Sequence, residues 1–211
     1  MDKGLSLQDV TIMKGSTPLL SVSHDIASGE VLTVMGPSGV GKSTLLAFVT
    51  GTLAADFTAT GRVLLDGHDI TDAAPHQRRV GILFQDDLLF PHLSVGANLT
   101  FGLLAGGTAA ARHDKVQEAL REVGLEGFAD RDPATLSGGQ KARIALMRML
   151  LSEPCALLLD EPFSRLDATL RAQVREMVFD RAKARGLPVL MVTHDAEDAQ
   201  AAGGMIITLG G

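Results

Sequence analysis

One glycine-rich segment limits the folds open to this chain of 211 residues more than any other feature. Residues 36–43 match the pattern G-x-x-x-x-G-K-[ST] at every fixed position. They follow a short β-branched run, typical of a buried strand, and precede a run long enough for a helix. Backbone N–H groups of such a loop surround a phosphate, and its lysine reaches the outer phosphate oxygens. A glycine-rich turn with a solvated lysine is the weaker interpretation. We therefore predict that a nucleoside triphosphate binds at Gly36, Pro37, Ser38, Gly39, Val40, Gly41, Lys42, Ser43 and Thr44.

The order of apolar segments predicts an α/β fold with a mostly parallel sheet. Short apolar runs typical of buried strands alternate with helical patterns, at 31–35, 80–84, 155–159, 189–192 and 205–208. Two strand-like segments around a turn predict an N-terminal antiparallel β subdomain within the first thirty residues. Helical spacing over 86–153 indicates an α-helical subdomain inserted into a body of 1–85 and 154–211. We expect one domain of this composite kind.

Charge and hydropathy exclude several function classes. The chain has 25 acidic and 19 basic residues, a net charge of −6 and no dense basic run. It is therefore a poor candidate for binding nucleic acid or anionic lipid. No apolar run approaches the roughly 18 residues of a membrane span, and the N-terminus lacks an apolar signal core. Together with the single cysteine, Cys155, this predicts a cytoplasmic location.

The segment Leu136–Gln140, read as Leu-Ser-Gly-Gly-Gln, has two interpretations. Ser137 and Gln140 fit a capping box at the start of a helix. Capping does not account for Gly138 and Gly139, each of which costs about 0.5–1 kcal/mol relative to alanine inside a helix. Glycines beside the N–H groups of a helix start suit close approach by a phosphate, which is the interpretation we favour.

Together these motifs resemble the ATP-binding subunits of ABC transporters, whose LSGGQ motif matches Leu136–Gln140 letter for letter. The resemblance covers essentially the whole chain and implies a P-loop NTPase. In that family two subunits pack head to tail, with ATP between the phosphate loop of one and the LSGGQ segment of the other. The resemblance therefore implies ATP binding across the dimer by Ser137, Gly138, Gly139, Gln140 and Asp167.

The resemblance also gives roles to residues at strand ends. Asp160 and Glu161 match the Walker B aspartate and the catalytic glutamate, and Gln85 matches the Q-loop glutamine. Ser43, Gln85 and Asp160 would hold Mg²⁺, while Glu161 would polarise the attacking water.

His194 matches the switch histidine, so Glu161, His194 and Gln85 form the implied catalytic set. Considered alone, a histidine such as His194 at a strand end is more often structural, and the two acids would be solvated carboxylates. Asp167 could equally cap the following helix.

The chain departs from the family at the nucleobase. The family usually stacks adenine on an aromatic residue, at a position that falls near Met13 or Lys14 here. The sequence has no tryptophan or tyrosine, and its first phenylalanine is Phe48. A thioether packs on a ring with less geometric demand than an aromatic side chain, so we expect relaxed base selectivity.

Two strings, residues 87–92 and Phe163–Ser164, most resemble bacterial uptake systems for thiamine, iron, sulfate or polyamines. The resemblance implies an importer ATPase on the inner face of the membrane. Its partners are a second copy, transmembrane permease subunits and, indirectly, a substrate-binding protein. Leu88, Leu89 and Phe90 either line a groove for the permease or belong to the core of the helical lobe.

Two other functions stay open. One is the ATPase of an export system. The other is a soluble ABC ATPase acting on nucleic acid, ribosomes or Fe–S assembly, which the negative charge disfavours. The chain ends soon after Thr208, so we expect no C-terminal regulatory domain.

Overall fold

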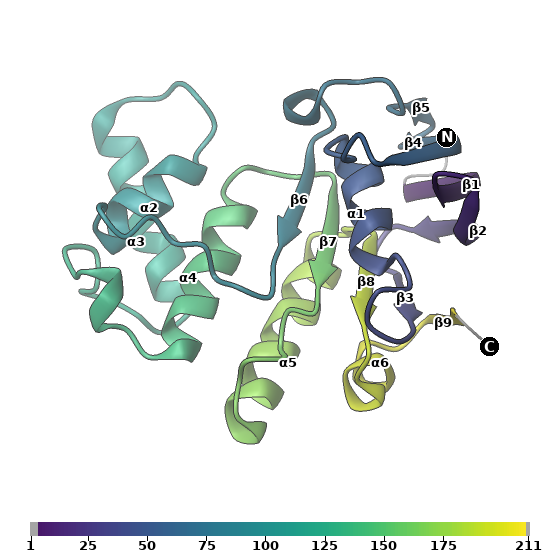
Figure 1. Cartoon of the computed structure of the whole chain (residues 1–211). Helices are drawn as coiled ribbons and strands as arrows, with labels where there is room; N and C mark the ends of the chain where they lie inside the picture. The colour runs from purple at the N-terminus through teal and green to yellow at the C-terminus, as the bar shows by residue number, and fades with distance from the viewer. Residues whose placement is uncertain (1–3, 210–211) are drawn as a thin grey trace. The chain divides into compact units, whose positions relative to one another are not determined.

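A computed structural model describes residues 4–209 (Figure 1). The described residues form two compact units. The α/β unit contains those up to Ile82, Cys155–Glu161, and those from Phe179 onward. The helical unit contains Leu83–Pro154 and Pro162–Val178. The predicted fold class is confirmed, but residues 83–85 and 162–178, which the sequence places in the α/β body, group with the helices.

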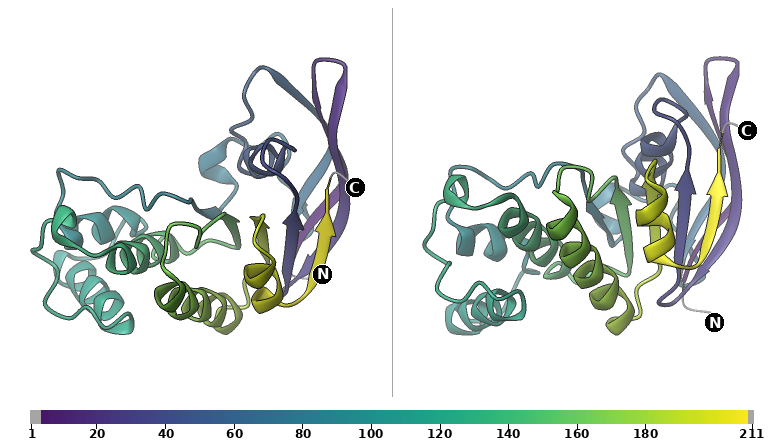
Figure 2. Two further views of the ribbon diagram at one scale, coloured as in Figure 1. Left: turned by 60° about the horizontal axis from the view of Figure 1, so that its bottom comes forward. Right: turned by 90° about the horizontal axis from the view of Figure 1, so that it is seen from below.

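A five-stranded sheet in the order β6-β7-β8-β3-β9 forms the centre of the α/β unit. Its strands are β3 (Val31–Met35), β6 (Val80–Leu83), β7 (Ala156–Asp160), β8 (Val189–Thr193) and β9 (Met205–Thr208). β3 pairs in parallel with β8 and β9, and β8 pairs in parallel with β7. Figure 2 shows β9 beside β3 at one edge. Helices α1 (Lys42–Thr50) and α6 (Ala196–Ala202) pack against the sheet.

A second, four-stranded sheet has the order β2-β1-β4-β5. It contains β1 (Gly4–Lys14), β2 (Thr17–Ala27), β4 (Phe57–Leu65) and β5 (His68–Asp69). β1 pairs antiparallel with β2 on one side and with β4 on the other. The hairpin of β1 and β2 is the predicted N-terminal subdomain, whereas β4 and β5 were not predicted.

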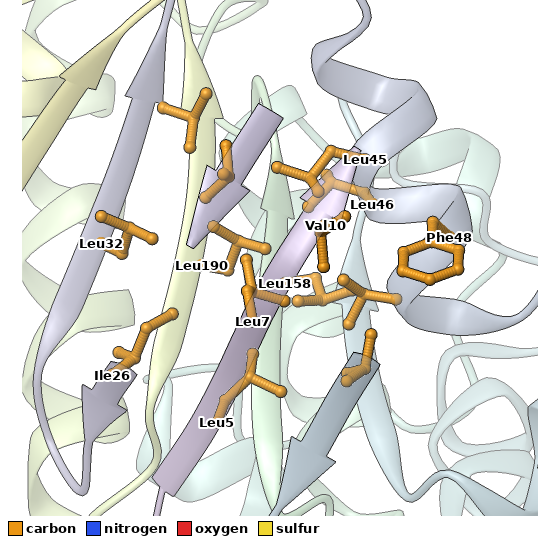
Figure 3. Close-up of a cluster of buried hydrophobic side chains, with 14 of the residues drawn as sticks. Leu5, Leu7, Val10, Ile26, Leu32, Leu45, Leu46, Phe48, Leu158 and Leu190 are labelled. Carbon is orange, nitrogen blue, oxygen red and sulfur yellow. The ribbon is translucent and has the colours of Figure 1, made fainter. Parts of the chain in front are cut away.

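The core of the α/β unit lies where both sheets and α1 meet (Figure 3). Alternate residues of the parallel strands contribute to it, and the residues between them are buried on the opposite face. Burial on both faces is what a parallel sheet requires. Among the core residues that Figure 3 labels are Leu5, Leu7 and Val10 of β1, Leu45 and Leu46 of α1, and Leu32, Leu158 and Leu190 of the parallel sheet.

The helical unit is built from α2 (Val95–Gly102), α3 (Ala109–Glu122), α4 (Gly138–Leu150) and the first part of α5 (Ala168–Ala184). Ser94 caps α2 and Thr108 caps α3, each through a side-chain oxygen. Apolar residues along α3 and α4 are buried, as their helical spacing predicts. Within residues 4–209, no helix combines the length and apolar character needed to cross a membrane.

Candidate active site

Three neighbouring parallel strands, β7, β8 and β3, carry most of the predicted site residues of the α/β unit. β3 leads into residues 36–41 and then α1, β7 ends at Asp160, and His194 follows β8. The carboxyl ends of parallel strands form one edge of a sheet, where open α/β sheets bind their ligands. The topology therefore gathers residues that are far apart in sequence.

The loop from Gly36 to Gly41 depends on a backbone conformation that favours glycine. Gly39 and Gly41 have φ angles of 86° and 102°. Gly41 is the N-cap of α1, yet no side chain caps this helix and its first turn contains no acidic residue. The N–H groups at the start of α1 are thus arranged as an anion-binding site.

Lys42 is 5% exposed and turns back over the loop. Its Nζ donates hydrogen bonds to the carbonyl oxygens of Gly36 at 2.8 Å and Pro37 at 3.1 Å. The same ammonium lies 3.7 Å from Oε1 of Glu161. The cation is therefore held by oxygen acceptors that phosphate oxygens can replace.

Ser43 and Asp160 bring two oxygen ligands together. The Ser43 hydroxyl donates to Oδ1 of Asp160 at 3.0 Å. Burial raises the pKa of the Asp160 carboxyl, and the neighbouring Glu161 raises it further, while the Ser43 hydrogen bond and Lys42 lower it. Removing a carboxylate from water disfavours its charged form. A hydroxyl and a desolvated carboxylate beside a phosphate loop are a donor set that suits Mg²⁺.

Glu161 directly follows β7 and has a left-handed backbone, with φ of 46°. That conformation costs a non-glycine residue roughly 1–2 kcal/mol. Its N–H donates to the Val192 carbonyl at 3.0 Å, and its Oε2 lies 3.1 Å from Nδ1 of His194. Glu161 is therefore in contact with both Lys42 and His194. A carboxylate in this position can accept a proton from water.

Arg78 supports the other end of α1 and was not predicted as a site residue. It is 5% exposed, and its Nη1 donates to the carbonyl oxygens of Phe48 and Val49 at 2.9 and 3.0 Å. Burial lowers the pKa of the guanidinium, opposed by the nearby Asp72. A cation at the C-terminus of a helix satisfies its last carbonyls and complements its dipole. The segment around Arg78 has no periodic pattern that would have revealed this.

The predicted residues of the helical unit meet at the start of α4. The Ser137 hydroxyl accepts from the Gln140 N–H at 3.3 Å, and Oε1 of Gln140 accepts from the Ser137 N–H at 3.0 Å. Both halves of the capping box are thus formed. Ser137 is exposed at this helix end. The capping interpretation of Ser137 and Gln140 is confirmed. Since capping accounts for these two residues, any argument for phosphate binding has to come from Gly138 and Gly139.

The two glycines of this segment have different surroundings. A Cβ on Gly139 would lie 2.3 Å from Cδ1 of Leu170 in α5, so any larger residue here would force the Leu170 side chain to shift. A Cβ on Gly138 would meet only the Leu166 side chain, at 4.0 Å. Steric packing within the helical unit thus favours glycine at position 139 and does not require it at position 138. The space beside Gly138 is open within this unit.

Asp167 and Gln85 also belong to the helical unit. Oδ1 of Asp167 accepts from the Leu170 N–H at 3.1 Å, which is the helix-capping contact. Gln85 is exposed in the segment after β6, and its neighbour Asp86 forms an ion pair with Arg165. Gln85, Asp167 and Ser137–Gln140 therefore lie in segments that contact one another within one unit.

Comparisons with known proteins agree with this pattern of motifs. A family model described as ABC transporter matches residues 19–164. The chain is 48% identical over 198 residues to the uncharacterized ABC transporter ATP-binding protein YnjD of Escherichia coli K12, covering 93% of this chain and 91% of that protein.

Two further relatives carry the names of import proteins. The thiamine import ATP-binding protein ThiQ of Cereibacter sphaeroides is 47% identical over 197 residues, covering 93% of this chain and 84% of the relative. The sulfate/thiosulfate import ATP-binding protein CysA of Caulobacter vibrioides is 42% identical over 201 residues. That match covers 92% of this chain and 58% of the relative.

Proposed function

The chain belongs to the ABC transporter family of ATP-binding, ATP-hydrolysing subunits, and from that membership we propose that it energises the import of a solute. In this proposal it works as a Mg²⁺-dependent, head-to-tail pair on the inner face of the cell membrane, bound to permease subunits. A substrate-binding protein delivers the solute to the permease. The import names of the thiamine and sulfate relatives support the direction.

One observation carries the ATPase proposal. The α/β unit brings the Lys42 ammonium, the Ser43–Asp160 pair and the Glu161–His194 pair to the carboxyl ends of adjacent strands. This combination supplies a phosphate-binding cation, oxygen ligands for a divalent metal and a base for water. Hydrolysis of a phosphoanhydride bond uses groups of all three kinds.

Ser43 and Asp160 are the residues of this unit that would hold Mg²⁺, with Gln85 proposed as a further ligand. Mg²⁺ prefers oxygen donors and retains several water molecules, so two protein oxygens and the phosphates suffice. Bound there, the ion neutralises charge on the β- and γ-phosphate oxygens. The raised pKa of Asp160 supports this fit, because a nearby cation relieves the cost of a buried carboxylate.

In the proposed reaction, Lys42 exchanges the carbonyl oxygens of Gly36 and Pro37 for phosphate oxygens of ATP. Glu161 orients the attacking water and accepts its proton. His194 contacts the γ-phosphate from the next strand, and its Nδ1, 3.1 Å from Oε2 of Glu161, helps to keep the carboxylate in place. Lys42, Glu161 and His194 already contact one another in this order, so the reacting groups are gathered before nucleotide binds.

The second copy completes the site. The start of α4 from one copy would meet the γ-phosphate held by Lys42 of the other, with Gly138 at closest approach and Asp167 nearby. The room around Gly138 supports this arrangement. ATP then favours the closed pair, and phosphate release reopens it, which makes nucleotide state the switch for the permease.

Exposed apolar side chains support a permease-docking surface on the helical unit. Of the exposed large hydrophobic residues, Phe84, Leu88, Phe101 and Leu104 fall in this unit. An open pocket of about 680 Å³ between α2 and α3 includes Phe101 in its lining. Exposed apolar patches on soluble domains commonly mark interfaces. Phe90, by contrast, is half-buried, with its ring centroid 4.6 Å from that of Phe101.

The proposed function is tested by partner recovery. A tagged Glu161→Gln protein is purified in mild detergent, with ATP, from membranes of the organism that encodes it. We expect a polytopic permease to co-purify, and less of it without ATP. Recovery only from the soluble fraction, together with ribosomes or nucleic acid, would contradict the transport assignment and leave the ATPase chemistry in place.

Base selectivity gives an independent prediction. Met13 and Lys14 stand where the family usually has its stacking aromatic residue, and Lys14 Nζ lies 5.7 Å from the ring centroid of Phe57. Phe57 packs partly into the core, so its ring is committed elsewhere. We expect kcat/KM for GTP to be within about tenfold of that for ATP, the ratio that 1.4 kcal/mol of differential binding would give. A preference for ATP far above this would disprove relaxed selectivity.

A further inference from the structure

Segment 87–94 follows Gln85 in the helical unit and is held by a buried side chain, Asn98 of α2. Oδ1 of Asn98 accepts from the Phe90 N–H at 2.8 Å. Its Nδ2 donates to the carbonyl oxygens of Phe90, Leu93 and Ser94 at 3.1, 3.2 and 3.0 Å. The fully buried side-chain amide of Asn98 thus provides this segment with the hydrogen bonds that a neighbouring strand or helix would otherwise supply.

Arg148 of α4 completes this arrangement. Its Nη1 donates to the Asn98 Oδ1 at 3.3 Å, and its Nη2 donates to the Asp87 carbonyl at 3.3 Å. The guanidinium carbon also lies 5.1 Å from the centroid of the Phe90 ring. The rigid fork of an arginine can make these contacts together, whereas a lysine cannot.

Opposite charges surround the same segment. Asp86 pairs with Arg165, which precedes α5. Burial raises the pKa of the Asp87 carboxyl and the neighbouring Asp86 raises it further, while the cations Lys141, Arg165 and Arg148 lower it. Asp87 is therefore held among cations from α4 and from the segment before α5.

We propose that Arg148, acting with Asn98, is a positioning residue that fastens segment 87–94 to α4. The segment contains Leu88, which is 56% exposed, and it directly follows Gln85 and Asp86. The same helix begins at Gly138, next to Ser137. When the start of α4 moves, the surface around Leu88 therefore moves with it, because segment 87–94 is attached to the helix. The proposal rests on the proposed function, because it assigns the permease contact to that surface.

The chain offers a matched control on the same helix. Arg143 is half-buried like Arg148, but it donates to the Val123 carbonyl and to Gln173, away from segment 87–94. Arg148→Met and Arg143→Met each remove one guanidinium from α4 and keep an apolar stem. Arg148→Lys serves as a second variant that retains the charge, in case the methionine variant does not fold.

The first measurement is amide hydrogen exchange on the isolated protein. We expect the Phe90 and Leu93 amides to exchange about tenfold faster in Arg148→Met than in wild type, and the α3 amides to exchange at the wild-type rate. In Arg143→Met, the Phe90 and Leu93 amides should exchange as they do in wild type. Arg148→Lys should be intermediate. Unchanged exchange at Phe90 and Leu93 would show that Arg148 does not hold the segment, and would overturn the proposal.

The second measurement compares ATP hydrolysis by the isolated subunit and by the complex purified with its permease. In Arg148→Met we expect the isolated subunit to hydrolyse ATP within about twofold of the wild-type rate. We expect the permease to stimulate that rate about tenfold less than in wild type, or the variant to fail to assemble with the permease. Unchanged stimulation, or an equal loss in Arg143→Met, would overturn the positioning role. If wild-type protein recovers no permease, the proposed function fails separately, and the exchange measurement still decides whether Arg148 holds the segment.

Discussion

Glu161→Gln is expected to bind ATP and hydrolyse almost none of it. Glutamine has the shape of glutamate but cannot accept a proton from water, and general bases contribute about 10²–10⁴-fold to such reactions. The substitution leaves Lys42 and the phosphate loop unchanged, so ATP affinity should be retained. Because hydrolysis normally reopens the pair, the variant should accumulate as an ATP-bound dimer.

Phosphate release and size-exclusion chromatography with ATP and Mg²⁺ measure the two effects. Glu30→Gln is the matched control: Glu30 is exposed in the same unit, and its carboxylate accepts from the Ala27 N–H. We expect this control to turn over ATP like wild type. A wild-type rate for Glu161→Gln would show that another group serves as the base.

Gly138→Ala is expected to lower ATPase activity, whereas Gly139→Ala is expected to lower stability. The new methyl group at position 139 meets Leu170, so we expect the free energy of unfolding to fall by about 1–3 kcal/mol. At position 138 the methyl group has room, so the fold should be retained. If ATP of the partner copy approaches there, displacing it by about 1 Å costs about 10²-fold in rate.

Chemical denaturation and phosphate release, both at a temperature where each variant is folded, separate the two effects. A Gly138→Ala protein that keeps full ATPase activity would contradict ligand approach at this glycine. A Gly139→Ala protein as stable as wild type would mean that Leu170 moves aside at no cost.

The strands and the phosphate loop could be predicted because their signals are local. An apolar β-branched run followed by a glycine-rich loop and a helix occupies about twenty consecutive residues, and the structure forms β3 and α1 there. β4 was missed, because its sequence contains Gly61 and exposed threonines rather than a continuous apolar run. α2 was missed as well; it has only eight residues.

The parts of the candidate site that could not be predicted from the sequence depend on packing between residues far apart in the chain. Gly139 packs closely against Leu170, and the partners of Arg78 include Phe48 and Val49. Neither contact has a sequence pattern, since each joins residues from different elements. The sequence therefore predicts phosphate binding at both Gly138 and Gly139, whereas the structure adds a packing restriction at Gly139 that the sequence does not reveal.

Arg78 stabilises one end of α1, and the other end has no cap of its own. A buried cation neutralises the carboxyl end of the helix, whereas the first turn at the amino end has neither a side-chain cap nor an acidic residue. Asp160 and Glu161 contact Ser43 and Lys42 there, but the N–H groups of the first turn still favour an anion. A ligand that binds only the folded state adds to the free energy of unfolding in proportion to the logarithm of its concentration. Bound nucleotide therefore stabilises the fold of the α/β unit, and a subunit without nucleotide has a lower free energy of unfolding.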